Sequence, residues 1–363
     1  MVMGKFFITV VLSVLLIAGF SSTASTCSSV FINSFPGYMI SARNMDYFGP
    51  CNPSLVITPR GIRRDGGDAA GVARWTTKYG SVVIYAEGVF PSDGMNEKGL
   101  ACHSQFYSDG SQIQQDNLDK PILESRAWVS YILDNFSTVA EAVQAIKENV
   151  RLVAVKLPIF YPTNAKHIAI EDLSSDAAII EIDNGKVNIY HDRNNCVMTN
   201  PPSYLEQVVN ANKYKNVKDI SNVPSGIVYS TDRFARASCL LRAMPKPDNK
   251  YQAQGFAMSV LYGLACPASL LDNADAQKEI LDVYGKYDKN LQDRKGGATY
   301  WMILSDLSHQ EFHFKSLFSA SEVWVNLREL DFSAGQPVRS KGSFHNYAKE
   351  GLEGNITSVV KKW

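Results

Sequence analysis

The most restrictive feature of this sequence is an apolar segment that ends just before Cys27. Residues 1–26 carry Lys5 near the start, continue through the apolar run FFITVVLSVLLIAGF and end in the small residues SSTAST. A charged start, an apolar centre and a small-residue end are typical of a signal peptide, which is removed and takes no part in the fold. We therefore expect a folded chain that spans residues 27–363 as a single domain.

The cleavage point has two candidates. A cut after Ala24 fits the preference for small residues better, because Ser22 occupies the other small position, but it leaves Ser25 and Thr26 to be trimmed. A cut after Thr26 would release Cys27 directly. In both cases we expect a periplasmic or secreted protein. We expect no membrane contact after signal removal, since no later apolar run approaches the ~18 residues of a spanning helix.

A mature chain that starts at Cys27 carries a thiol and an α-amine on one residue. The pKa of an α-amine is roughly 7.7–8.0, against about 10.4 for a lysine, so the amine is partly neutral near pH 7. It can then take the proton of the neighbouring thiol as a general base. Position alone leaves other readings open: a buried structural thiol, a disulfide partner, or a lipid-modified anchor, which Thr26 disfavours because a lipobox has Gly, Ala or Ser at that place.

Composition argues against several classes of protein. The 36 basic and 36 acidic residues balance, which gives no sign of a nucleic-acid partner. The six cysteines contain no C-x-x-C pair and the six histidines do not cluster with them, so we expect no metal and no other cofactor. Cys102, Cys196 and Cys239 lie in apolar runs and are predicted to be small core residues.

Strands are predicted at both ends of the chain, with helices and further strands between them. Predicted strands are Ser29–Ile32, Tyr38–Ala42, Leu55–Thr58, Gly80–Tyr85, Leu100–Phe106, His167–Glu171, Ala177–Glu181, Lys186–His191, Ala298–Leu304, Glu311–Phe314 and Glu322–Asn326. Predicted helices are Pro121–Asn135, Ser137–Glu148, Tyr204–Ala211, Thr231–Arg242, Tyr251–Tyr262 and Ala274–Tyr284, and Gly94–Gly99 is a predicted turn. This order favours an α+β fold of two mostly antiparallel sheets with helices outside.

Arg43 and Asp46 stand at the end of the second strand of a predicted hairpin that starts at Cys27. A hairpin folds this strand back, so that the guanidinium and the carboxylate can lie beside Cys27. Arg43 would favour the thiolate over the thiol, and Asp46 could orient the α-ammonium by accepting a hydrogen bond. The alternative is an ordinary exposed ion pair, worth about 0–1 kcal/mol.

Five short motifs occur in order along the chain. They are Cys27-Ser-Ser with Ala42-Arg-Asn-Met-Asp46, then DGMNEKGL at Asp93–Leu100, VMTNP at Val197–Pro201, DRFARA at Asp232–Ala237, and the closing strands from Thr299 to Phe332. Together they resemble the choloylglycine hydrolase family, the bile salt hydrolases and penicillin V acylases, which are cysteine N-terminal nucleophile hydrolases. The resemblance spans Cys27 to about Gly335. It implies a four-layer αββα sandwich.

The same resemblance implies roles for individual residues. It makes Cys27 the nucleophile, with a polar set around it: Arg43, Asp46, Asn200 as an oxyanion-hole amide, and Arg233. Losing one oxyanion donor typically costs on the order of 10²–10³ in rate. Phe106 stands where the family often has asparagine or tyrosine, so that only its backbone N–H could join the oxyanion hole. Asp232 replaces the usual serine before Arg233.

The predicted function is that of an exported cysteine amidase that hydrolyses a small-molecule linear amide. The signal peptide resembles the exported Gram-negative branch of the family, which implies penicillin V or N-acyl homoserine lactones as substrates. An apolar acyl group would contact the aromatic residues Tyr47, Trp75, Phe106 and Tyr107. The alternatives are a conjugated bile salt hydrolase and, from another class, a non-catalytic periplasmic binding protein on the same scaffold. The family also implies a possible homotetramer.

Overall fold

The structure is a computed structural model, and it describes most of the chain after the apolar leader. The described residues are 27–48, 51–107, 113–155, 166–226, 229–270 and 297–363. The expected signal peptide and the predicted helix Ala274–Tyr284 lie outside them.

One large sheet contains Cys27 at the start of its second strand. Its seven strands lie in the order β14-β1-β2-β15-β16-β17-β19. Their bounds are β14 Val197–Thr199, β1 Ser28–Ile32, β2 Ile40–Phe48, β15 Gly297–Asp306, β16 Glu311–Ser316, β17 Val323–Asn326 and β19 Gly354–Asn355. β1 and β2 pair antiparallel, so the predicted N-terminal hairpin is confirmed.

The second large sheet has eight antiparallel strands in the order β13-β12-β11-β8-β7-β6-β3-β18. Their bounds are β13 Lys186–His191, β12 Ala177–Asp183, β11 Lys166–Glu171, β8 Ala101–Phe106, β7 Phe90–Asn96, β6 Ser81–Ala86, β3 Pro53–Thr58 and β18 Arg339–Lys341. Two short pairs lie outside it: β4 Arg63–Asp65 with β5 Arg74–Thr76, and β9 Ile122–Glu124 with β10 Arg151–Val153.

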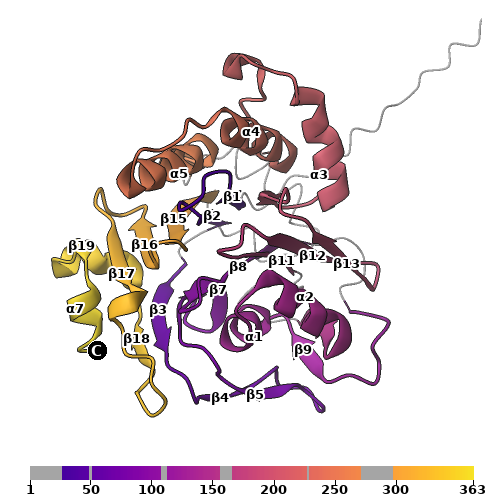
Figure 1. Ribbon diagram of the computed structural model, residues 1–363, viewed down its shortest axis with the longest axis vertical. Helices are drawn as coiled ribbons and strands as arrows, with labels where there is room; N and C mark the ends of the chain where they lie inside the picture. Colours follow the sequence, from indigo (N-terminus) through magenta and orange to yellow (C-terminus); the bar gives the residue numbers. More distant parts are fainter. Residues whose placement is uncertain (1–26, 49–50, 108–112, 156–165, 227–228, 271–296) are drawn as a thin grey trace, which may run out of the picture.

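Helices cover the outer faces of both sheets (Figure 1). The α-helices are α1 Trp128–Asn135, α2 Val139–Glu148, α3 Tyr204–Ala211, α4 Ser230–Ala243, α5 Lys250–Leu264 and α7 Thr357–Val360. Short 3₁₀ helices occupy Asn212–Tyr214, Ile220–Asn222, Ala268–Leu270, Leu327–Glu329 and Phe344–Glu350. α1 and α2 pack on the eight-stranded sheet, and α4 and α5 pack on the seven-stranded sheet. Among the described helices, none is long and apolar enough to cross a membrane.

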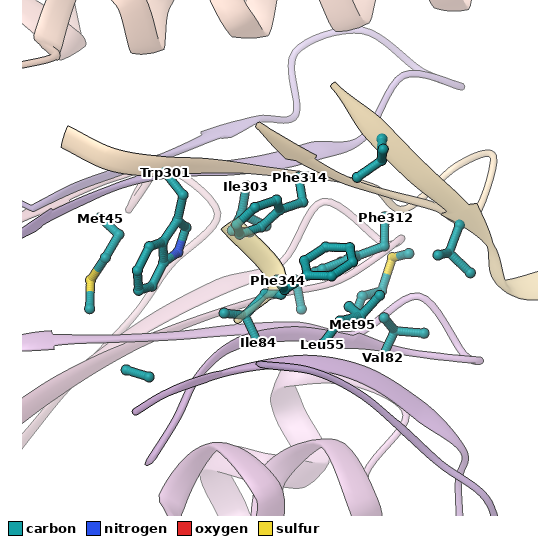
Figure 2. Packing of buried hydrophobic residues seen from close by; sticks show 14 of the residues in the cluster. Met45, Leu55, Val82, Ile84, Met95, Trp301, Ile303, Phe312, Phe314 and Phe344 are labelled. Atoms are coloured by element: carbon teal, nitrogen blue, oxygen red, sulfur yellow. The ribbon is translucent and has the colours of Figure 1, made fainter. Parts of the chain in front are cut away.

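The largest part of the core lies between the two sheets. Figure 2 shows aromatic side chains of the seven-stranded sheet facing aliphatic side chains of the other: Trp301, Phe312 and Phe314 opposite Leu55, Val82 and Ile84. Two further apolar layers separate each sheet from its helices. Because burial of apolar surface stabilises by roughly 25 cal/mol per Å², these three layers fix a helix–sheet–sheet–helix order. The predicted α+β, four-layer αββα sandwich is confirmed.

The first half of the DGMNEKGL segment is strand, so the turn predicted over Gly94–Gly99 begins only after Asn96. β7 continues to Asn96, and Gly94 lies inside it. A Cβ on Gly94 would come within 2.7 Å of the Leu133 side chain and 2.8 Å of a carbonyl oxygen in β6. Gly94 is therefore needed for close packing of α1 on the sheet, whereas only Gly99, with φ of +76°, serves the chain reversal.

The predicted helix Pro121–Asn135 is also too long. Its first part is strand β9, which pairs in parallel with β10, and α1 begins only at Trp128. The indole N–H of Trp128 donates to the Leu123 carbonyl oxygen at 2.8 Å, which fixes the change of direction. Pairing with a strand almost 30 residues further on overrides the local helical period, a contact that periodicity cannot reveal.

None of the six cysteines forms a disulfide, and all six lie in the described part of the chain. Cys102 and Cys239 are buried, as the apolar runs around them predict. Cys196 is only half-buried, which corrects its assignment to the core, because it lies in the turn that precedes β14.

Candidate active site

Strand register places Cys27 between Met45 and the predicted site residue Asn200. Ser28 pairs with Asn44 on one side and with Thr199 on the other. One step further along these antiparallel ladders, Cys27 lies beside Met45 and Asn200. Its side chain is 3% exposed, and its Sγ lies 3.9 Å from the Met45 sulfur and 3.5 Å from the Asp46 carbonyl oxygen. The hairpin thus brings the end of β2 to the cysteine, and the pairing of β14 with β1 brings Asn200 to it.

Arg43 faces the thiol directly. Its Nη2 lies 3.4 Å from Cys27 Sγ and 3.0 Å from the Met45 sulfur, while Nη1 forms an ion pair with Asp93. Both partners of the ion pair are buried, with exposed fractions of 1% and 0%. Burial lowers the pKa of Arg43, but the charges of Asp93 and Cys27 more than offset this and leave it above its usual value. A permanent cation beside Sγ favours the thiolate.

Asp93 is a site residue that the sequence analysis missed, although it is the first residue of the DGMNEKGL motif. Burial raises the pKa of its carboxyl, but Arg43 and a hydrogen bond from His103 outweigh burial and lower it below the usual value. The carboxylate is therefore ionised and holds Arg43 from the opposite sheet. Treating this motif as a turn hid the role, because a turn carboxylate would face solvent.

Asp46 is held on the other side of the cysteine. The hydroxyl of Thr299 donates to its carboxylate, and the two residues are register partners on β2 and β15. The register of this pair shifts between Thr299 and Trp301, a bulge of the kind that often re-aims side chains next to active sites. The expected hydrogen bond from the α-ammonium of Cys27 to Asp46 stays a prediction.

Arg233 and Asn200 form the third part of the site. Arg233, at the buried start of α4, donates from Nη1 to the Cys27 carbonyl oxygen and to Ser28 Oγ, both at 2.6 Å. Its Nη2 donates to Asn200 Oδ1 at 3.4 Å, and Asn200 Nδ2 donates to the Phe106 carbonyl oxygen at 2.9 Å. These two bonds orient the amide and leave one N–H of Nδ2 beyond the bond to Phe106. Asn200 as an oxyanion donor stays a prediction.

Side chains from α3 and α4 hold the backbone of Asn200 in place. Gln207 Nε2 and Ser230 Oγ both donate to the Asn200 carbonyl oxygen, at 2.8 and 2.5 Å. Because the backbone of Asn200 is fixed, its side-chain amide keeps its position, and stabilisation of charge by a preorganised group requires such a fixed position. The backbone N–H of Phe106 as a second oxyanion donor stays a prediction.

The structure does not gather the four aromatic residues that were predicted to bind substrate. Tyr47 is buried in the core between the sheets, and Phe106 ends β8 next to Asn200. Trp75 lies on β5, beyond the eight-stranded sheet, where its indole N–H donates to Asp134 at 2.8 Å (Figure 1).

Tyr107 is also engaged in the scaffold. Its hydroxyl donates to Asp183 and its ring stacks on His167 at 4.9 Å between centroids. The four aromatic residues therefore do not form one continuous wall. Phe106 is the member of the predicted set that contacts a polar site residue, through its carbonyl oxygen.

Lys166 is a second cation near the cysteine that sequence reasoning did not single out. Its ammonium lies 4.6 Å from the centroid of the Phe90 ring, in the core that also contains Cys27. Burial lowers the pKa of Lys166 to about 8, although the charges of Cys27 and Cys51 act in the opposite direction. Arg43 and Lys166 together therefore make the surroundings of Sγ electropositive. Among the described residues, no group of three or more metal-ligating side chains is present.

The two sheets between helical layers, with a cysteine at the start of an inner strand beside a guanidinium and an oriented amide, define a hydrolase of amide bonds. Comparison with known proteins agrees. The family of linear amide C–N hydrolases called the choloylglycine hydrolase family matches residues 27–284, so the match begins at Cys27 itself. The chain belongs to this family.

Individual relatives and solved structures give the same picture. The chain is 31% identical over 309 residues to a penicillin V acylase of Pectobacterium atrosepticum, covering 82% of this chain and 79% of the relative. It is 29% identical over 196 residues to a bile salt hydrolase/transferase of Clostridium perfringens, covering 53% of this chain and 58% of the relative. The structure of a penicillin V acylase from Agrobacterium tumefaciens superposes with a TM-score of 0.75 at 27% identity, over 92% of this chain and 96% of the other.

Proposed function

We propose that this hydrolase is an exported cysteine amidase whose nucleophile is Cys27. The observation that carries the proposal is the 3.4 Å approach of Arg43 Nη2 to Cys27 Sγ at the residue where the family match begins. The guanidinium favours the thiolate, and Arg233 orients the Asn200 amide on the far side of the cysteine. A reacting carbonyl between them would meet a nucleophile on one side and a hydrogen-bond donor on the other.

Hydrolysis would proceed through an acyl thioester. The α-amine of Cys27 takes the thiol proton, Sγ adds to the substrate carbonyl carbon, and the C–N bond breaks as the α-ammonium gives its proton to the leaving amine. Water then gives a proton to the α-amine and adds to the thioester. The C–S bond breaks, the thiolate recovers a proton from the α-ammonium, and the carboxylic acid leaves.

The active form should therefore begin at Cys27, by direct signal cleavage or by trimming of Ser25 and Thr26. A peptide bond on the α-nitrogen removes its basicity, and general base catalysis contributes typically about 10²–10⁴ in rate. We expect exported enzyme to show the mass of the chain from Cys27 to Trp363. We expect a form that retains Ser25 and Thr26 to lose activity by that factor. Intact-mass spectrometry together with an amine-release assay on both forms checks this, and full activity of the longer form would contradict it.

Penicillin V and long-chain N-acyl homoserine lactones are the proposed substrates. The match to the penicillin V acylase relative covers 82% of the chain, and Phe106, whose carbonyl oxygen accepts a hydrogen bond from Asn200, adds an apolar residue next to that amide. The alternative is a conjugated bile salt hydrolase, which the likeness to the Clostridium perfringens enzyme supports over a shorter length. Membership in a family of hydrolases argues against a non-catalytic binding protein. The homotetramer and the periplasmic or secreted location stay predictions.

A substrate panel tests the proposed specificity. We expect kcat/KM for penicillin V or a long-chain acyl homoserine lactone to exceed that for glyco- and tauro-conjugated bile salts by about 10- to 100-fold. The reason is that each steroid hydroxyl left unpaired against the apolar Phe106 side chain costs about 1–3 kcal/mol. Rates of amine release at matched enzyme concentration give the comparison. A preference for taurocholate or glycocholate would make this enzyme a bile salt hydrolase.

A further inference from the structure

A line of buried polar side chains continues from Arg43 away from the thiol. Asp93 Oδ1 lies 2.9 Å from His103 Nδ1, and His103 Nε2 lies 2.5 Å from Ser41 Oγ. Ser41 Oγ lies 3.1 Å from Glu171 Oε2, which ends the line. All four side chains are buried, with exposed fractions between 0% and 3%.

Between His103 and Glu171 this line crosses the space between the two sheets twice, to Ser41 and back. Ser41 and Arg43 lie two residues apart on β2, so their side chains point to the same face of the seven-stranded sheet. Asp93, His103 and Glu171 come from three neighbouring strands of the eight-stranded sheet, with Asp93 and His103 directly paired. Polar groups in an apolar layer are costly unless every one is satisfied. These buried polar residues therefore do more than fill the space between the sheets.

Counting protons shows what this line requires. Three hydrogen bonds join Asp93, His103, Ser41 and Glu171, and each needs one proton. Asp93 is ionised, so His103 donates from Nδ1 to it. Ser41 brings one proton, which leaves one hydrogen bond without a donor.

The missing proton has two places to reside. If it is on His103 Nε2, the imidazolium donates to Ser41 and Ser41 donates to a Glu171 carboxylate. If it is on Glu171, the carboxylic acid donates to Ser41 and Ser41 donates to a neutral His103. Both arrangements keep all three bonds and the same total charge. Loss of this proton breaks one bond and adds one negative charge.

We propose that Asp93, His103, Ser41 and Glu171 are positioning residues for the nucleophile, and that one proton shared by His103, Ser41 and Glu171 keeps Asp93 fixed on Arg43. With the proton present, Arg43 is held so that its second nitrogen faces Cys27. When the proton is lost, the added negative charge disfavours the Cys27 thiolate, and the hydrogen bonds that hold Asp93 in place become fewer. This inference concerns the site of the proposed function and rests on Cys27 as its nucleophile.

The shared proton is lost near neutral pH. Burial raises the pKa of Glu171 to about 7, with His103 and Ser41 acting in the opposite direction. The other groups that face Glu171 are Asp93 on β7, Asp172 next along its own chain, Cys102 on β8 and Cys196 before β14. Both thiols have pKa values raised above the usual one, so they stay neutral across this range. Glu171 is therefore the group whose protonation decides the charge of the line.

Glu171→Gln provides a sharp test, because its amide donates to Ser41 at every pH and so imitates the protonated acid. The unmodified protein and Glu171→Gln share every other titrating group near Cys27, including Lys166 with a pKa of about 8. We expect the ratio of their rates of Cys27 alkylation by iodoacetamide, plotted against pH, to show an inflection near pH 7. Above pH 8 the variant should react faster, by up to about tenfold, the equivalent of one unit of thiol pKa. The alkylated peptide is quantified by mass spectrometry. Arg43→Ala removes the cation and should give the slowest Cys27 alkylation of the proteins compared.

Glu181→Gln is the matched control. Glu181 is equally buried and also pairs with a histidine, His167, at 3.0 Å, but it does not join the line to Arg43. Its alkylation profile should equal that of the unmodified protein. Coincident profiles for Glu171→Gln and the unmodified protein would overturn the proposal. If Glu171→Gln does not fold, Ser41→Ala serves instead: it removes a hydrogen bond that lowers the pKa of Glu171, so the inflection should move to higher pH, and an unmoved inflection would overturn the proposal.

Thermal unfolding reports on the same proton without reference to catalysis. Since the folded pKa of Glu171 lies above its unfolded value, the stability that it contributes is present below the unfolded pKa and is lost as pH rises through about 7. Tm should therefore fall between pH 5 and 8 more steeply in the unmodified protein than in Glu171→Gln. Equal slopes would also count against the shared proton. If both readouts behave as expected but no amide is cleaved, the line stands and the proposed function fails.

Discussion

Cys27→Ser should abolish amide hydrolysis and leave the fold intact. Serine keeps nearly the volume of cysteine in a position that is 3% exposed, so packing changes little. Its hydroxyl, however, is a far weaker nucleophile beside a mild amine base, and Arg43 at 3.4 Å from Sγ stabilises a thiolate much more readily than an alkoxide. We expect a loss of the whole catalysed rate, on the order of 10⁶-fold or more. An amine-release assay and circular dichroism give the two readouts.

Cys239→Ser is a suitable control for this substitution. Cys239 is a buried cysteine on α4 whose Sγ contacts Arg242 at 3.0 Å and the Tyr214 carbonyl oxygen at 3.8 Å, contacts that a hydroxyl can also make. Its rate should stay within a factor of about two of the unmodified enzyme, since surface and scaffold changes away from a site act mainly on stability. Substantial activity in folded Cys27→Ser would assign the nucleophile elsewhere.

Asn200→Ala should lower kcat by about 10²–10³ with little change in KM. The amide is oriented by Arg233 and by the Phe106 carbonyl oxygen, so its remaining N–H can meet charge that develops only as the tetrahedral intermediate forms. An interaction made only in the transition state affects kcat and not ground-state binding. Steady-state kinetics with the best substrate of the panel measures both constants.

Asn96→Ala separates catalysis from stability. Asn96 is as fully buried as Asn200, but its side chain donates to the Leu133 and Phe136 carbonyl oxygens behind α1. Its loss should lower Tm and leave kcat per folded molecule unchanged, because buried carbonyl groups lose their partner without any effect near Cys27. If Asn200→Ala changed Tm alone, as expected for Asn96→Ala, Asn200 would be a structural residue and the oxyanion would have another donor.

Several parts of the site could be anticipated because they depend on local geometry. Cys27, Arg43 and Asp46 belong to one hairpin, and a hairpin fixes its own register once the turn is known. Asn200 and Arg233 came from the resemblance, and the structure brings both to Cys27 through β14 and α4. The fold class followed from the order of predicted strands and helices.

Other parts were not accessible to sequence reasoning. Asp93 was hidden by a glycine that serves close packing and not a turn, and Thr299 faces Asp46 only because β15 pairs with β2 across more than 250 residues. Trp75 was predicted to contact substrate because an aromatic side chain suits an apolar acyl group. In the structure its strand pairs outside the large sheets.

The sequence by itself determined the nucleophile candidate, the family and the layered fold, because these depend on short motifs and on patterns along one strand or helix. The tertiary structure alone decided which charges surround the thiol. Arg43 lies on one sheet, and its partners Asp93, His103 and Glu171 lie on the other. Contacts between facing sheets are set by how the sheets pack and by the exclusion of water from the space between them, and no spacing within either segment records that geometry.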